Sequence, residues 1–242
     1  MEKKLIVANW KENFTVAESQ KWVESFGSQL SALSSQLEVI ICPSFVLIPF
    51  LHSQLSPLTS RLSLGAQDVS KFEEGQYTGE VSAKMLKDFV KYVIVGHSER
   101  RRYFGETDED VSRKVEQCLK YDLTPIVCVS NLEQASMSQP HFAKASRGKC
   151  VKESKKIVFA YEPVFAVGTG IPDTPENAQE FAQKIKSIIS QNVRVLYGGS
   201  VNLENVKSFV SQPDISGVLV GQASLDPKEL ARIVEVTHLC VK

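Results

Sequence analysis

Eight short apolar runs alternate with longer segments of helical periodicity along this chain of 242 residues. Uncharged runs that are rich in β-branched residues are typical of strands buried on both faces of a sheet. Regular alternation of strands and helices predicts parallel strands joined by right-handed crossovers. The predicted strands are Leu5–Asn9, Glu38–Cys42, Arg61–Gln67, Tyr92–Val95, Pro125–Val129, Ile157–Glu162, Val193–Tyr197 and Ile215–Val220.

Apolar residues at helical spacing identify the segments between these strands, as Trp22 and Phe26 do in the first. Pro49 must lie near the first turn of its helix or distort it. The polar segment Ser130–Lys156 has only a weak helical period, and we expect it to be irregular. The predicted helices lie within Val16–Leu33, Phe45–Leu55, Val81–Phe89, Asp108–Lys120, a segment starting at Thr174, Asn202–Val210 and a segment starting at Asp226.

Eight strand–helix units in 242 residues indicate a closed (β/α)₈ barrel, an α/β fold. Single barrels of this class have about 250 residues. No linker or change of composition divides the chain, so we expect residues 1–242 to form one domain. An open, doubly wound sheet is less favoured, because no Gly-rich dinucleotide motif follows the first strand.

Composition limits the partners and the compartment of the protein. The chain has 28 basic and 28 acidic residues, and this balance argues against nucleic-acid or membrane-surface binding. Its first apolar run is too short for a signal peptide or a membrane span. The five cysteines include no C-x-x-C pair, and Cys42 and Cys128 lie in predicted strands. We therefore expect reduced thiols, a cytoplasmic protein and no cysteine-rich metal site.

Polar residues follow several predicted strands. In barrels of this class the active site lies at the carboxyl ends of the strands. Considered alone, Lys11 could be a solvated loop residue, and His97 could be a buried core histidine. We expect Arg101 and Arg102 to be solvated. Convergence on one rim favours a catalytic site instead. The candidates are Asn9, Lys11, His97, Glu99, Glu162, Gly199, Ser200, Gly221 and Gln222.

The segment Ala160–Gly170 combines a strand end, a carboxylate and a glycine-containing loop. Glu162 follows the sixth strand directly and precedes Pro163, which disfavours helix there. Gly168 and Gly170 allow unusual backbone angles and a close approach of amides to an anion. We interpret Glu162 as an acid or base beside a loop that closes over a ligand. The small residues after strands seven and eight predict a phosphate site.

Five segments, in order and across the whole chain, resemble triosephosphate isomerases. The resemblance implies a TIM barrel that interconverts dihydroxyacetone phosphate and glyceraldehyde 3-phosphate through an enediolate. It also implies a cytoplasmic isomerase of glycolysis and gluconeogenesis that needs no metal or organic cofactor. The segments are Ala8–Lys11, Val95–Arg101, Ala160–Gly170, Tyr197–Val201, and Gly221 with Ala223–Leu225.

The same resemblance implies a role for each candidate. Glu162 is then the base, His97 a neutral hydrogen-bond donor to the enediolate, and Lys11 a fixed positive charge. Asn9 is a polar neighbour, and Glu99 pairs with Lys11. Val164–Gly170 is then the lid that closes over the substrate. The phosphate is bound by the backbone amides of Gly168, Ser200, Gly221 and Gln222.

The resemblance also extends to a loop associated with subunit contacts. Gln76–Glu80 is similar to the family loop that projects into a neighbouring subunit. It implies a homodimer in which Thr78 lies near the active site of the partner. The expected partners are thus a small phosphorylated triose and a second copy of the chain, with no nucleic acid and no membrane.

Four positions depart from the family pattern. Phe165 replaces a tryptophan at the lid, which keeps aromatic packing but removes an indole donor. Gln222 replaces a second glycine, and because its Cβ restricts the backbone we expect weaker phosphate binding. Ser130-Asn131 replaces Gly-Glu, without direct catalytic loss. Ile171–Asp173 replaces the usual C-terminal hinge, where Pro172 adds stiffness.

Two alternatives to this function remain open from the sequence. One is another phosphate-binding barrel isomerase, which would share the phosphate site without the set of Lys11, His97 and Glu162. The other is a catalytically weakened relative that binds a small phosphate ester, suggested by Phe165 and Gln222.

Overall fold

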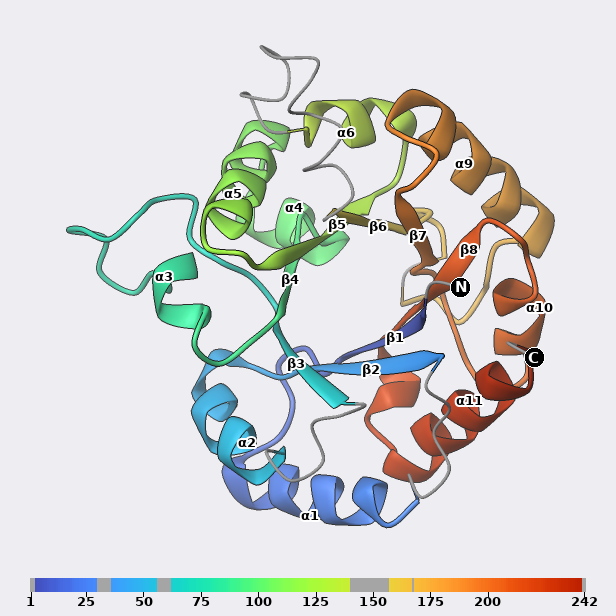
Figure 1. Cartoon of the computed structure of the whole chain (residues 1–242), viewed down its shortest axis with the longest axis horizontal. Coiled ribbons are helices and arrows are strands. Elements are labelled where there is room, and N and C mark those ends of the chain that lie inside the picture. Colours follow the sequence, from blue (N-terminus) through green and yellow to red (C-terminus); the bar gives the residue numbers. More distant parts are fainter. Residues whose placement is uncertain (1–2, 30–35, 56–61, 140–156, 167, 241–242) are drawn as a thin grey trace.

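The computed structural model describes residues 3–29, 36–55, 62–139, 157–166 and 168–240. Within them, eight parallel strands close into a barrel in chain order (Figure 1). This confirms the predicted (β/α)₈ architecture, and each predicted strand end lies within one residue of the observed one. The strands are β1 Lys4–Asn9, β2 Leu37–Cys42, β3 Leu62–Ala66, β4 Tyr92–Val95, β5 Thr124–Val129, β6 Val158–Tyr161, β7 Arg194–Tyr197 and β8 Ile215–Val220.

The helices surround the barrel (Figure 1). None of the described helices is long and apolar enough to cross a membrane. Two short 3₁₀ turns, η1 Phe45–Leu47 and η3 Gln222–Ser224, precede α2 and α11. The α-helices are α1 Val16–Gly27, α2 Ile48–Leu55, α3 Ala83–Leu86, α4 Ser98–Phe104, α5 Asp108–Lys120, α6 Leu132–Met137, α9 Pro175–Ile188, α10 Val206–Val210 and α11 Pro227–Leu239.

Several helices differ from the sequence prediction. α3 and α10 are shorter than predicted, and α1 ends at Gly27, with residues 30–33 outside the described part of the chain. Pro49 is the second residue of α2, where its missing N–H costs no helical hydrogen bond. The segment predicted to be irregular contains α6, and its residues 140–156 lie outside the described residues. Helix α4 was not predicted.

Both faces of the strands are buried, which explains their continuous apolar runs. Successive side chains alternate, so Leu5 and Val7 of β1 pack inside the barrel while Ile6 and Ala8 pack in the layer beneath the helices. The inner layer is formed by Leu5, Val7, Ile40, Cys42, Tyr92, Ile94, Ile126, Cys128, Val158, Ala160, Leu196 and Leu219. It fills the barrel centre, so the inside of the ring is a packed core.

The barrel closes where β8 pairs with β1. Val195 pairs with Ile215, but Leu196 pairs with Gly217, so β8 contains one extra residue, Ser216. Gly217 then lies opposite Leu5 with φ 149°. A Cβ at Gly217 would lie 1.9 Å from the Leu5 carbonyl oxygen. Closure of the ring therefore requires glycine at this position.

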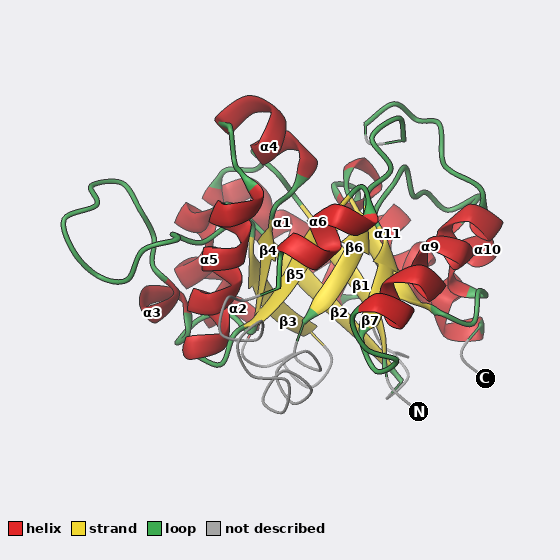
Figure 2. Cartoon of the chain, turned by 90° about the horizontal axis from the view of Figure 1, so that it is seen from above, coloured by secondary structure: helices red, strands yellow, loops and turns green. Residues whose placement is uncertain are grey.

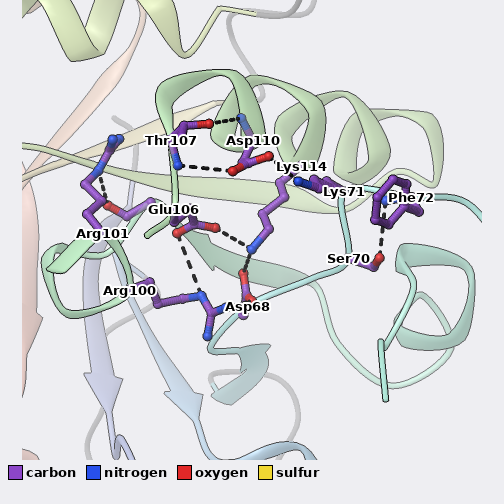
Figure 3. Close-up of polar contacts among 11 residues, drawn as sticks. Asp68, Ser70, Lys71, Phe72, Arg100, Arg101, Glu106, Thr107, Asp110 and Lys114 are labelled. Atoms are coloured by element: carbon purple, nitrogen blue, oxygen red, sulfur yellow. Dashed lines mark hydrogen bonds and ion pairs between the residues drawn. The ribbon is translucent and has the colours of Figure 1, made fainter. Parts of the chain in front are cut away.

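A buried charged cluster joins the loop after β3 to α4 and α5 (Figure 3). Lys114 of α5 pairs with Glu106 and lies 2.6 Å from Asp68, and Arg100 lies 2.9 Å from the other Asp68 oxygen. Burial raises the pKa of Asp68, and the nearby Glu106 carboxylate adds to this effect. The ionised form of Asp68 therefore depends on its two cations.

The expectation that Arg101 is solvated is wrong. Its side chain is 15% exposed, its Nη1 lies 2.6 Å from Asp108 Oδ1, and its Nε donates to the Gly96 carbonyl at 2.8 Å. Gly96 has φ 71°. Arg101 thus secures the turn that leads into α4. Arg102 is exposed, as predicted, with its guanidinium over the Tyr103 ring.

We predict that Lys114→Met lowers the free energy of unfolding by about 3 kcal/mol, because two buried carboxylates lose their shared cation while Arg100 remains. Urea unfolding at fixed protein concentration measures the change. Lys184→Met is the matched control, since its i,i+4 pair with Glu180 is exposed and contributes about 0.5 kcal/mol or less. Equal effects of the two substitutions would contradict the assignment.

Candidate active site

A cavity of about 590 Å³ lies at the carboxyl ends of the strands. In the side view this rim carries α4 (Figure 2). The structure brings all the candidates together there, although they come from five strands and the lid. The cavity is lined by Asn9, Lys11, His97, Glu99, Glu162, Gly168, Gly199, Ser200, Gly221 and Gln222, together with Gly170, Gly198, Val201, Asn202, Leu219, Ala223 and Glu229.

The Glu162 carboxylate lies at the base of this cavity. The residue is 1% exposed, and its N–H donates to the Val129 carbonyl at 2.9 Å, which continues the β5–β6 pairing. Its Oε2 accepts a hydrogen bond from the Ser98 N–H at 3.0 Å. Its Oε1 lies 3.2 Å from His97 Nε2 without meeting hydrogen-bond geometry, and it has no hydrogen-bond partner among the described residues. A buried acceptor without a partner is available to a proton of a ligand.

The His97 ring is oriented by the start of α4. His97 is the N-cap residue of this helix, and its Nδ1 accepts a hydrogen bond from the Glu99 N–H at 3.2 Å. A ring nitrogen that accepts a hydrogen bond carries no proton, so this contact assigns the proton to Nε2. His97 therefore presents a neutral N–H donor beside Glu162.

Lys11 is held in an uncommon backbone conformation, with φ 52°. Its N–H donates to Asn9 Oδ1 at 3.1 Å, and Gln67 Nε2 donates to the Lys11 carbonyl at 2.8 Å and to the Cys42 carbonyl at 2.9 Å. Positive φ in a non-glycine residue costs about 1–3 kcal/mol, which these contacts offset. The Lys11 ammonium pairs with Glu99, as the family resemblance implied.

Gln67 is a positioning residue that sequence reasoning missed. It directly follows β3 and donates to two loop carbonyls near the cavity. Its place at the carboxyl end of a strand was the available signal, because polar residues at this rim are candidates. Asn202 and Glu229, which line the cavity near the ends of β7 and β8, were also missed.

The turn after β7 is closely packed around both of its glycines. A Cβ at Gly199 would lie 2.2 Å from the Tyr197 hydroxyl oxygen, and a Cβ at Gly198 would lie 3.0 Å from Glu162 Cγ. Gly221, after β8, has φ −91°, and a Cβ there would lie 3.7 Å from Lys11 Cε. The backbone of both turns thus lies close to the side chains of the site.

The predicted lid, Val164–Gly170, is attached to the turn after β7; Val167 lies outside the described residues. The Ser200 hydroxyl donates to the Ala166 carbonyl at 2.7 Å and accepts from the Gly170 N–H at 3.2 Å. Gly168 and Gly170 have φ 69° and 77°, a left-handed conformation that favours glycine at both positions. The expected packing of Phe165 is wrong, because this residue is 58% exposed.

Two tyrosines anchor the C-terminal end of the lid at Asp173, which is buried. The Asp173 N–H donates to the Tyr197 hydroxyl at 2.8 Å, and the Tyr161 hydroxyl donates to Asp173 Oδ2 at 3.0 Å. Burial raises the pKa of Tyr197 to about 12, so its hydroxyl stays neutral at ordinary pH. These contacts fix the hinge that the sequence located at Ile171–Asp173.

We predict that Ser200→Ala loosens the lid, because one substitution removes two hydrogen bonds. With about 0.5–1.5 kcal/mol for each bond, hydrogen exchange at the Gly170 amide should accelerate about tenfold. Ser187→Ala is the control, since the Ser187 hydroxyl donates only within α9, to Lys184 at 2.8 Å. Unchanged exchange at Gly170 would show that Ser200 does not restrain the lid.

Comparison with known proteins identifies the family. The triosephosphate isomerase family model matches residues 4–237. A relative named triosephosphate isomerase from Mesomycoplasma hyopneumoniae (strain 232) is 39% identical over 241 residues, covering 96% of this chain and 98% of its own. A relative with the same name from Dictyoglomus turgidum is 40% identical, and the match covers 97% of this chain and 99% of the relative. Another, from Aquifex aeolicus, is 39% identical, and the match covers 96% of this chain and 98% of the relative. The chain belongs to the triosephosphate isomerase family.

Proposed function

We propose that this chain, as a single catalytic domain, interconverts dihydroxyacetone phosphate and glyceraldehyde 3-phosphate in the cytoplasm. One observation carries the proposal beyond family membership: a buried carboxylate oxygen without a partner among the described residues lies 3.2 Å from a neutral imidazole nitrogen inside one cavity. An acid–base group and an oxyanion donor are the two elements that proton transfer beside a carbonyl requires.

Proton transfer begins at Glu162. Its carboxylate removes a proton from the carbon next to the carbonyl of dihydroxyacetone phosphate, and the electron pair moves to the carbonyl oxygen to form an enediolate. The same carboxyl group then returns the proton to the neighbouring carbon, while the hydroxyl proton on the first oxygen is transferred to the second oxygen, which gives the aldehyde. Burial suits Glu162 to this work, because a buried carboxylate meets the reacting carbon with little competing water.

His97 and Lys11 stabilise the charge that develops on oxygen. His97 Nε2–H donates a hydrogen bond to the enediolate oxygen as a neutral imidazole. Triosephosphate isomerase is itself the established example of a neutral histidine in this role, so the assignment follows from family membership, and the contacts described above support it. Lys11 contributes a positive charge whose position is set by Glu99 and Asn9.

The turns after β7 and β8 and the lid bind the phosphate group. The backbone amides of Gly168, Ser200, Gly221 and Gln222 are the proposed donors, since all four residues line the cavity. Closure of Val164–Gly170 would keep water from the enediolate and prevent elimination of phosphate.

We predict that Glu162→Ala lowers kcat by at least about 10²–10⁴-fold, because the reaction loses its base. A coupled assay of glyceraldehyde 3-phosphate isomerisation measures this, with Glu229→Ala as a control for loss of a carboxylate elsewhere in the cavity. A wild-type rate no higher than that of Glu162→Ala, with phosphate-ester binding intact, would instead support a weakened relative that only binds its ligand.

We also propose a homodimer formed through the loop Gln76–Glu80. The loop between β3 and α3 extends away from the barrel (Figure 1), and Thr78 in it is exposed. Tyr77, 42% exposed, stacks on Phe72 with ring centroids 4.1 Å apart, so the loop presents an aromatic pair. Such a pair suits insertion into a second subunit.

Sedimentation equilibrium should give twice the mass of the chain, and Tyr77→Asp should shift the protein toward the monomer, because the substitution places a charge in an apolar contact. Ile188→Asp is the matched control, as Ile188 is 47% exposed on α9, on the side of the barrel away from this loop (Figure 1). A Tyr77→Asp protein that stays dimeric would exclude this interface.

A further inference from the structure

The side chains around the cavity supply little positive charge for a phosphate dianion. Among its described lining residues, Lys11 is the single Lys or Arg, and it already pairs with Glu99. Glu162 and Glu229 add two more carboxylates to the lining. The dianion must therefore be bound largely by neutral hydrogen-bond donors, and each such donor has a measurable effect on affinity.

Three neutral polar side chains line the cavity near the ends of β7 and β8, and two of them are held in place by hydrogen bonds within the protein. The Ser200 hydroxyl is bonded to the lid on both sides. The Asn202 side-chain oxygen accepts from the N–H groups of Glu204 and Asn205 at 3.0 and 3.1 Å, which forms the turn before α10. Gln222 is exposed at the cavity, and within the described part of the chain its carboxamide has no hydrogen-bond partner.

The backbone at Gln222 accepts a side chain without strain. Gln222 begins η3 and is not among the described non-glycine residues with positive φ, which are Lys11, Phe14 and Asp122. Its Cβ therefore incurs no left-handed backbone penalty. This observation removes the physical reason for expecting weaker phosphate binding at this position.

We propose that the Gln222 side-chain carboxamide donates a hydrogen bond to the substrate phosphate, in addition to the backbone amides. The inference rests on the proposed function for the identity of the substrate, but the chemistry it names is recognition of a phosphate group. A carboxamide is a neutral donor, so it adds a phosphate contact in a cavity whose charged side chains are mostly acidic.

Two substitutions separate the carboxamide from the Cβ. Gln222→Ala removes the carboxamide and keeps the Cβ, whereas Gln222→Gly removes both. We expect both to weaken binding of inorganic phosphate about fivefold and to raise KM more than they change kcat, because one hydrogen bond to an anion at an exposed site is lost. Gln222→Glu should weaken binding further, since it places a negative charge beside the dianion.

Titration calorimetry with inorganic phosphate measures binding without turnover, and thermal unfolding checks that each variant is folded. Gln212→Ala is the control, because Gln212 follows α10 and does not line the cavity. An unchanged dissociation constant in Gln222→Ala, or tighter binding in Gln222→Gly, overturns the proposal. An inactive wild-type protein with the expected loss in Gln222→Ala would refute the isomerase activity and leave the phosphate contact standing.

Discussion

The pairing of β8 with β1 is the contact on which the site depends. Because Gly217 has no side chain, the β8 backbone approaches Leu5 closely enough to complete the ring. The extra residue at Ser216 sets the register of the last strand. That register places Gly221 beside the Lys11 side chain, so the first and last strands contribute to a single cavity. Without closure, the phosphate turn and the cation would lie on opposite edges of an open sheet.

Within the cavity, a series of short contacts links the strand ends, and each contact orients the next side chain. Asn9 fixes the backbone of Lys11, whose ammonium pairs with Glu99. The Glu99 N–H in turn fixes the His97 ring, which faces Glu162. A displaced group at one strand end would therefore disturb its neighbours, as expected of a preorganised site in which polar groups are fixed before the substrate arrives.

The sequence predicted the barrel well because burial of both strand faces leaves a strong apolar signal. The strand ends followed directly, and with them the positions of His97 and Glu162. Helix α4 was missed because it has no buried residue, so no apolar stripe marks it. Arg101 was misjudged for a related reason: its partners, Asp108 and the Gly96 carbonyl, are defined only by the folded turn. Contacts made by polar groups at a distance leave no periodic pattern to detect.

The Ser200 hydroxyl takes part in two processes at once, since it ties the lid and also lines the end of the cavity where phosphate is expected. Any anion that draws this hydroxyl toward itself must change the stability of the loop, and by thermodynamic linkage the loop must change the affinity for the anion by the same free energy. Substitutions in Val164–Gly170 at positions without ligand contact should therefore change the affinity for the ligand. Sequence variation in this loop is then a means of adjusting how fully the active site is occupied by its ligand, without altering the reacting groups.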